Sequence, residues 1–308
     1  MSIKKQNIQG LTFKLFYPFL WFIGLLPFPL LFLISDLFGI VVGIVGYRRK
    51  VITQNLTNAF PEKSRLEIRK VRFLFYRHFC DLFVETLALQ HFSPQRILTR
   101  VETVNAEMLQ QSFDNGKDVI AVLGHYGNWE WVPAAMLQFN NVLGASVYRP
   151  LKNKWFNKFM LNIRSCFNTQ NIPLNSTTRE IVKLKKKNQR FALGLIADQS
   201  PSKSELHYWT DFLNQNTAVI LGPEKMAKLT NADLYYWKME KTSRGRYRIT
   251  FIPFPGDIQT AAEYEATEWH VRLLEKQIRQ QPQYWLWSHK RWKYQHLYKP
   301  GKHIKHSS

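Results

Sequence analysis

The sequence predicts an α/β fold in which helices flank a mainly parallel central sheet, preceded by an apolar helical segment at the N-terminus. Three observations support this prediction. After residue 118, short apolar runs rich in β-branched residues alternate with stretches of helical periodicity. Three of those runs end in polar side chains. The run from Leu15 to Ile34 contains no charged residue and is long enough to cross a hydrocarbon core of about 30 Å as a helix.

The N-terminal segment is expected to anchor the chain to a membrane. Ser35 and Asp36 end its uncharged run, and a second apolar stretch follows at residues 37–46. Three prolines within the first run disfavour one straight helix, and basic residues on both flanks select no orientation. We therefore expect two short helices, bent at the prolines, that dip into one leaflet with both ends on the cytoplasmic side. A helix buried in the protein core is the alternative.

The remainder of the chain reads as one catalytic domain. No internal repeat or low-complexity linker divides it, so we place an anchor at residues 1–50 and the catalytic domain at residues 51–308. Ser64 and Glu67 form an S-x-x-E capping pattern, which predicts a helix from Arg65 to about Leu89. The basic tail beyond Lys299 is expected to be solvated.

Beyond this helix, strands and helices are expected to alternate, as in a parallel sheet with crossover helices. The predicted strands are 118–124, 141–149, 191–198, 232–240 and 246–254. The predicted helices are 129–139, 154–165 and about 260–280, with a basic turn at 183–190.

The charge of the chain predicts a polyanionic environment. Its 43 basic and 22 acidic residues give a formal net charge of +21, which suits nucleic acid, an anionic membrane surface or an acidic protein or substrate. The 15% aromatic content, with 10 tryptophans, is typical of membrane interfaces. Cys80 and Cys166 are the two cysteines and neither belongs to a CxxC motif, which argues against a disulfide framework or a cysteine metal site.

Polar side chains follow three of the predicted strands. They lie at residues 125–130, 148–153 and 197–199. Because working residues in α/β folds gather at the carboxyl ends of the strands, we expect these three clusters to form a single site.

The first cluster contains His125 and Glu130, five residues apart. On one continuous helix they would point roughly 140° apart, but a turn at Gly127 and Asn128 between a strand and a helix would let them meet. Histidine can then take a proton from a hydroxyl group, with the carboxylate accepting a hydrogen bond from the other ring nitrogen. The cluster contains no serine or cysteine, so the attacking hydroxyl would belong to the substrate. A solvated histidine near a helix start is the alternative.

The blocks that carry these residues have a family likeness. They are GHYGNWE, VYRPLKNKWFNKFMLNIR, GLIADQSP, NTAVILGPEKMAKLTNADLYY and PQYWLWSHKRWK, together with GYRRKVITQNLTNAFPEKS near the N-terminus. From about residue 15 to residue 293 the sequence resembles the late acyltransferases of bacterial lipid A biosynthesis, within the lysophospholipid acyltransferase superfamily. The resemblance implies a glycerolipid acyltransferase-like fold. It also implies acyl transfer from a carrier-protein thioester to a hydroxyl of a phosphorylated, membrane-embedded glucosamine lipid.

The resemblance further implies His125 as the general base and Glu130 as its orienting partner, in the glutamate form of the H-x4-D/E motif. Arg149 is expected to meet a phosphate or the oxyanion, and residues 287–293 to cradle an anionic headgroup or snorkel at the membrane surface. A surface arginine is the alternative for Arg164, and a purely structural role for Asp198 and Gln199. The predicted substrate-binding residues are Asn128, Arg149, Asn153, Arg164, Asp198, Gln199 and Arg291.

We expect no metal or other cofactor, because His125 has no second histidine at ligand spacing, and acyl-ACP or acyl-CoA would be a co-substrate. The expected partners are acyl carrier protein, a lipid A precursor or other anionic lipid, and the membrane, but not nucleic acid. The expected location is the cytoplasmic side of a bacterial inner membrane. The alternatives are acylation of a lysophospholipid, glycolipid or aminolipid, a thioesterase, and a non-catalytic binder of polyanions or nucleic acid.

Overall fold

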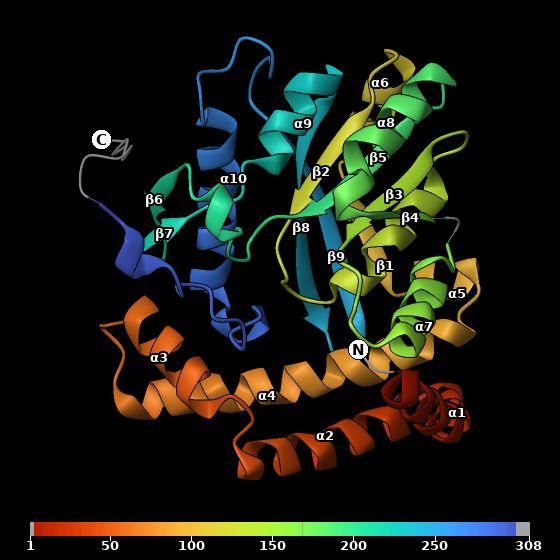
Figure 1. The fold of residues 1–308 in the computed structure, drawn as a ribbon, viewed down its shortest axis with the longest axis vertical. Coiled ribbons are helices and arrows are strands. Elements are labelled where there is room, and N and C mark those ends of the chain that lie inside the picture. The colour runs from red at the N-terminus through yellow and green to blue at the C-terminus, as the bar shows by residue number, and fades with distance from the viewer. Residues whose placement is uncertain (1–2, 168, 300–308) are drawn as a thin grey trace.

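A computed structural model of the chain describes residues 3–167 and 169–299, so the predicted basic tail lies outside the described residues (Figure 1). The helices are α1 (Ile3–Leu25), α2 (Phe28–Val45), α3 (Arg49–Ala59), α4 (Arg65–Ala88), α5 (Pro94–Leu98), α6 (Ala106–Asp114), α7 (Lys154–Arg164), α8 (Thr177–Lys186), α9 (Gly222–Thr230) and α10 (Glu265–Gln280). The strands are β1 (Val101–Val104), β2 (Val119–Leu123), β3 (Leu143–Tyr148), β4 (Thr169–Pro173), β5 (Phe191–Ile196), β6 (Trp209–Asp211), β7 (Asn216–Ala218), β8 (Asp233–Ser243) and β9 (Arg246–Pro253).

The described strands form one large sheet, in the order β1-β9-β8-β2-β5-β3-β4, and a small β6-β7 pair. Strands β8, β2, β5, β3 and β4 run parallel to one another. Strand β9 is antiparallel to β8, and β1 runs parallel to β9. The predicted α/β fold with a mainly parallel sheet is therefore confirmed. The carboxyl ends of β2 and β5, which are neighbours, open on the same edge of the sheet.

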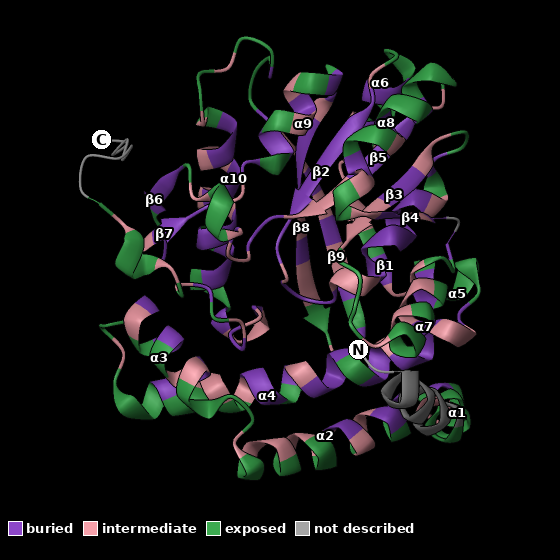
Figure 2. Ribbon diagram, in the orientation of Figure 1, coloured by how far each residue is buried: buried purple, intermediate pink, exposed green. Residues whose placement is uncertain are grey.

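The hydrophobic core lies on both faces of this sheet, as the buried strands of Figure 2 indicate. Every residue of β2 is buried, and successive residues of a strand point to opposite faces. Ile120 and Val122 join a core cluster that includes residues of α8, α9 and α10. Val119, Ala121 and Leu123 join a second cluster with residues of α6 and α7. The central strand is thus fixed from both sides, which makes its carboxyl end a rigid position for a functional group.

The predicted strands at β2, β3, β5, β8 and β9 are confirmed, as is the capping box of Ser64 and Glu67 at the start of α4. The predicted helix at 129–139 forms as a 3₁₀ helix, Trp129–Gln138, rather than an α-helix. Pro133 explains the difference, because proline has no N–H for the α-helical ladder and its ring clashes with the carbonyl four residues earlier. The predicted basic turn at 183–190 is only half correct, since α8 extends to Lys186.

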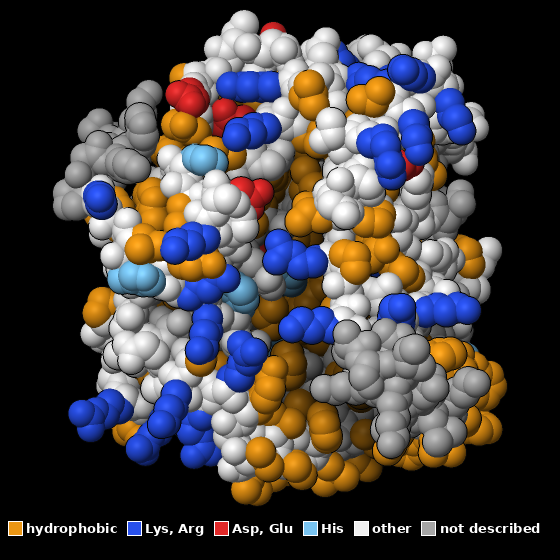
Figure 3. Space-filling view, viewed as in Figure 1, with side chains coloured by type: hydrophobic (Ala, Val, Ile, Leu, Met, Phe, Trp, Pro, Cys, Tyr) orange, Lys and Arg blue, Asp and Glu red, His pale blue; other side chains and the backbone are white. Residues whose placement is uncertain are grey.

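The N-terminal segment forms two helices as expected, but they are 23 and 18 residues long rather than short, because Pro18 lies inside α1 and the break falls at Pro27. Helix α2 lies alongside α4 (Figure 1). Among the described helices, Phe28–Val45 is long and apolar enough to cross a membrane, with a mean hydropathy of 2.4 and 22% of its residues buried. Apolar side chains are therefore exposed here and gather at the lower edge of Figure 3. They include Leu15, Phe16, Phe19 and Phe22 of α1, and Leu33, Leu37, Ile40, Val41, Ile44 and Val45 of α2.

Candidate active site

His125 and Asp198 meet at the carboxyl ends of β2 and β5. The two strands pair with Leu123 opposite Ile196, so the residues that follow them are brought together. Asp198 Oδ1 lies 2.6 Å from His125 Nδ1, and its Oδ2 accepts from the His125 backbone N–H at 2.8 Å. The carboxylate is buried, whereas 19% of the histidine side chain is exposed. A histidine that is held on one side and open on the other is suited to moving a proton.

A third donor completes the surroundings of the carboxylate. The indole N–H of Trp285 donates to Asp198 Oδ2 at 2.6 Å. Burial would raise the pKa of Asp198, but the charge and hydrogen bond of His125, the indole of Trp285 and the His125 amide together hold this pKa below its usual value. Asp198 therefore remains an ionised acceptor in the protein interior.

The second nitrogen of the imidazole faces Gln199, whose Nε2 lies 3.3 Å from His125 Nε2. Because Asp198 accepts from Nδ1, the neutral ring carries its proton there and leaves a lone pair on Nε2. Gln199 donates to that lone pair. The predicted Asp198 and Gln199 thus both contact His125, and a substrate hydroxyl reaching Nε2 would take the place of the Gln199 amide.

The predicted hydrogen bond between His125 and Glu130 is wrong for this structure. Both carboxylate oxygens of Glu130 instead accept from Arg164, at 2.7 Å from Nε and 2.6 Å from Nη2. The planar guanidinium matches a carboxylate with two parallel hydrogen bonds, which a neutral imidazole cannot offer. Burial would lower the pKa of Arg164, but the bond to Glu130 raises it above its ordinary value. Glu130 therefore orients Arg164. The side chain that contacts His125 from this segment is Trp129, whose ring packs edge-on against the imidazole.

Helix α7 brings Arg164 to this position. Asn153, a predicted substrate-binding residue, caps the start of the helix by accepting from the N–H groups of Trp155 and Phe156 at 3.0 and 3.1 Å. Its side-chain oxygen thus stabilises the start of α7, and the substrate contact predicted for Asn153 stays a prediction. Arg149, at the end of β3, is exposed and remains accessible to an anionic group.

The turn after His125 is fixed by buried contacts. Gly127 adopts φ +61°, a left-handed conformation that favours glycine, and its N–H donates to Tyr284 O at 3.0 Å. The Asn128 side chain is buried and donates to Glu85 Oε2 of α4 at 2.7 Å. The substrate contact predicted for Asn128 is therefore corrected: its amide holds the turn from inside the protein.

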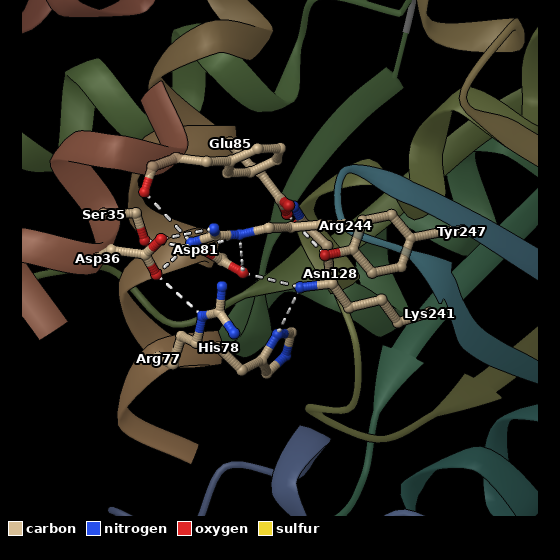
Figure 4. Close-up of polar contacts among 11 residues, drawn as sticks. Ser35, Asp36, Arg77, His78, Asp81, Glu85, Asn128, Lys241, Arg244 and Tyr247 are labelled. Carbon is tan, nitrogen blue, oxygen red and sulfur yellow. Dashed lines mark hydrogen bonds and ion pairs between the residues drawn. The ribbon is translucent and has the colours of Figure 1, made fainter. Parts of the chain in front are cut away.

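Glu85 lies on α4 beside the polar contacts that join α2, α4 and the β8–β9 hairpin (Figure 4). It also accepts from the Tyr247 hydroxyl at 2.6 Å. Its burial raises the pKa of Glu85 to about 7, even though the charge of Lys241 and the hydrogen bonds of Tyr247 and Asn128 act in the opposite direction. Asp81, on the preceding turn of α4, adds to the rise.

The pKa of Glu85 predicts a pH-dependent stability. Since the folded pKa of about 7 lies above the ordinary 4.5, the contribution of this carboxyl is full below pH 4.5 and is lost as the pH rises through 7. The Glu85→Gln variant imitates the protonated form. We expect its unfolding free energy, relative to that of the unsubstituted protein, to rise by about 2–3 kcal/mol between pH 5 and pH 8 in denaturant titrations. The exposed Glu107→Gln control should follow the unsubstituted protein at every pH, and parallel curves for Glu85→Gln would contradict the prediction.

The C-terminal segment is not the surface cradle that its composition suggested. Trp285, Trp287 and Arg291 are buried, and burial lowers the pKa of Arg291 to about 10. The Leu286 N–H donates to His125 O at 3.1 Å, so the segment packs directly behind the histidine. A substrate headgroup at the membrane surface therefore does not meet Arg291 in this arrangement.

Trp285 was not among the predicted site residues. The signal available for it was the density of aromatic residues in PQYWLWSHKRWK, which is equally typical of a membrane surface.

Within the described part of the chain, no group of three or more His, Cys, Asp or Glu side chains is arranged to hold a metal ion. The arrangement can hold one proton at Nδ1 of His125 and exchange another at Nε2.

The sequence is similar to known proteins over nearly its whole length. Residues 4–294 match the family described as bacterial lipid A biosynthesis acyltransferase. The chain is 25% identical over 280 residues to the lipid A biosynthesis palmitoleoyltransferase of Escherichia coli (strain K12), covering 89% of this chain and 88% of that protein. It is equally similar to a lipid A biosynthesis acyltransferase of Shigella flexneri. It is 23% identical over 278 residues to the lipid A biosynthesis lauroyltransferase of E. coli, covering 89% of each chain.

Proposed function

The chain belongs to the bacterial lipid A biosynthesis acyltransferase family and is an acyltransferase, and we propose its reaction from the site. It moves a fatty acyl chain from an acyl-carrier-protein thioester to a hydroxyl of a lipid A precursor. The observation that carries the mechanism is the His125–Asp198 pair at the carboxyl ends of adjacent strands. The family resemblance and the enzyme class expected from the sequence agree with the matches.

In the proposed reaction, His125 Nε2 takes the proton of the acceptor hydroxyl as its oxygen attacks the thioester carbonyl. The new C–O bond forms, the C–S bond breaks, and the imidazolium returns the proton to the leaving thiolate. Asp198 stabilises the transient positive charge on the ring and keeps Nε2 free to act as the base. General-base assistance of this kind contributes about 10²–10⁴ in rate. The residues of the site require no metal or other cofactor for these steps.

We assign Arg164 and Arg149 to anionic parts of the substrates. Glu130 accepts from two N–H donors on one edge of the Arg164 guanidinium, so this cation is oriented before the substrate arrives. Its remaining N–H groups can donate to a phosphate or to the oxyanion that forms on the thioester carbonyl. Arg149 is exposed at the end of the neighbouring β3 and suits a phosphate of the acceptor.

We propose that α1 and α2 hold the enzyme on the cytoplasmic face of a bacterial inner membrane. Exposed apolar side chains of both helices, continued by Leu66, Phe73 and Phe83 of α4, give a surface that water solvates poorly. The net charge of +21 favours an anionic membrane, an acidic carrier protein and a phosphorylated acceptor. This placement brings both substrates to one side of the membrane.

Mass spectrometry of the lipid products tests the proposal. Membranes bearing the protein are incubated with acyl-carrier-protein thioester and a tetra-acylated lipid A precursor, beside His125→Ala at matched expression. We expect a product heavier by one acyl chain, reduced at least 100-fold in His125→Ala and unchanged in a control that replaces the exposed His296 with alanine.

Other outcomes of this experiment assign other functions. Acylation of a different lipid in the total extract would keep the mechanism and change the acceptor. Release of free fatty acid without any acylated lipid would identify a thioesterase. A lipid A product undiminished in His125→Ala would refute His125 as the base.

A further inference from the structure

Residues 284–292, which we call the C-terminal strap, contact both members of the His125–Asp198 pair. The Leu286 N–H donates to His125 O at 3.1 Å, and the Trp285 indole donates to Asp198 Oδ2 at 2.6 Å. Tyr126, the residue after the histidine, forms an isolated antiparallel bridge with Trp285. The strap therefore lies against the loops that carry the pair, although it is remote from them in sequence.

The strap is itself held in place from two sides. The Ser200 hydroxyl donates to the backbone carbonyl of Arg291, and the Ser200 N–H donates to His289 Nε2 at 3.3 Å. On the other side, the Asn55 amide of α3 donates to the carbonyls of Trp287 and His289, both at 2.9 Å. These contacts fix the backbone that carries Arg291.

The side chain of Arg291 is a buried cation. The residue is 4% exposed, and among the residues that the structure describes its buried Nε has no hydrogen-bond partner. It lines a small cavity together with Asp198, and the rest of the lining is mainly apolar. Because a buried charge without a counter-charge is strongly unfavourable, the cation needs an anion within this low-dielectric region.

Asp198 is the one carboxylate that lines this cavity. The other titratable groups that line it, Tyr236 and His270, are neutral near pH 7, as is His289, which interacts electrostatically with Asp198. Burial raises the pKa of Tyr236 on β8 well above its usual value, and it lowers the pKa of His270 on α10 to about 3 and that of His289 on the strap to about 4. When His125 is unprotonated, as a general base must be, Arg291 is thus the cation that faces the buried carboxylate.

We propose that Arg291 is a positioning residue that balances the charge of Asp198 while His125 is unprotonated, and so keeps the base available at neutral pH. This inference rests on the proposed function of His125. Without the cation, the buried His125–Asp198 pair would hold its extra proton over a wider pH range, because the protonated pair then has the lower charge to bury. The strap would therefore tune the proton affinity of the pair without touching a substrate.

The pH profile of the full-length enzyme tests this role. We expect Arg291→Gln to move the acid limb of the kcat/KM profile upward by about one pH unit, so that activity is lost at the acid end and recovered as the pH is raised. Arg291→Lys should restore the original profile, because it returns a positive charge to the cavity. Lys290→Gln, which removes the same charge from an exposed neighbour, should leave the profile unchanged.

An unchanged acid limb in a folded Arg291→Gln enzyme, or an equal loss at every pH, would overturn the inference. If that variant fails to fold, Trp285→Phe gives an independent test, because it removes a donor to the ionised Asp198 and should shift the limb in the same direction. His125→Ala distinguishes a failure of the proposed function from a failure of this inference. An active His125→Ala enzyme would overturn the proposed function, whereas an inactive one beside an unshifted Arg291→Gln would overturn this inference alone.

Discussion

Replacing Asp198 with asparagine should lower kcat by about 10³–10⁴ with little change in KM. Asp198 Oδ2 accepts from two N–H donors, those of the His125 backbone and the Trp285 indole. The amide oxygen of an asparagine must take that position, so its NH₂ group faces His125 Nδ1. An imidazole that accepts there carries its proton on Nε2, where the base needs a lone pair. The variant keeps the shape of the site but moves the proton of the neutral His125 ring from Nδ1 to Nε2.

Asp118→Asn is the matched control for this measurement. Asp118 is also buried, but it precedes β2 and pairs with Lys185 and Arg190 at the opposite edge of the sheet. We expect it to reduce stability while kcat of the folded enzyme stays within a few-fold of the original. Steady-state kinetics of the lipid product distinguish the two variants. Retention of more than a tenth of kcat by Asp198→Asn would show that another group orients His125.

Glu130 should behave differently from Asp198, because it acts through Arg164. Glu130→Gln and Arg164→Gln are expected to lower kcat/KM by similar factors, and the double variant should be little worse than either single one. This non-additivity follows from the bidentate ion pair, since removing either partner already releases the other. Additive losses in the double-mutant cycle would contradict it and would give Glu130 a separate role.

The site around His125, Glu130 and Asp198 is predictable from the sequence only in part. The continuous apolar runs of β2 and β5 identify buried strands, and the polar residues after them identify a site. The sequence does not reveal that β5 is the neighbour of β2, because strand order depends on crossovers between distant segments. The sequence pattern therefore favours Glu130, five residues away, as the partner of His125 over Asp198, 73 residues away.

The missed elements have similar causes. Strands β1 (VETV) and β4 (TQNIP) are short and contain polar residues, so their periodicity is too weak to distinguish them from loops. The C-terminal strap combines aromatic and basic residues in a pattern that suits a membrane surface. Its burial depends on contacts with α3 and with the loop after β5, which only the folded chain brings together. Composition predicted the kinds of side chain here but not their surroundings.

Replacing Asp81 with alanine should destabilise the protein by about 3–5 kcal/mol, the largest loss we expect from a single polar substitution. Asp81 on α4 accepts from Lys241 at 2.9 Å and from Arg244 at 2.6 Å, and it also accepts from Ser35 of α2 at 2.7 Å (Figure 4). Burial would raise the pKa of Asp81, but the bonds from Arg244 and Lys241 hold it below its usual value. Removing the carboxylate leaves Lys241, whose side chain is 6% exposed, without its counter-charge.

Denaturant titration in detergent micelles measures this loss, with Glu102→Ala as the control. Glu102 pairs with Arg248 between β1 and β9, but both side chains are largely exposed, so breaking that pair should cost about 0–1 kcal/mol. Hydrogen exchange provides a second readout. Arg244 bonds both Asp81 and Asp36 of α2, so Asp81→Ala should speed amide exchange in α2 more than in β2. A loss of unfolding free energy no greater than that of the control would mean that apolar packing alone holds α2 against α4. A large loss would make the buried charges the link between the apolar helices and the catalytic domain.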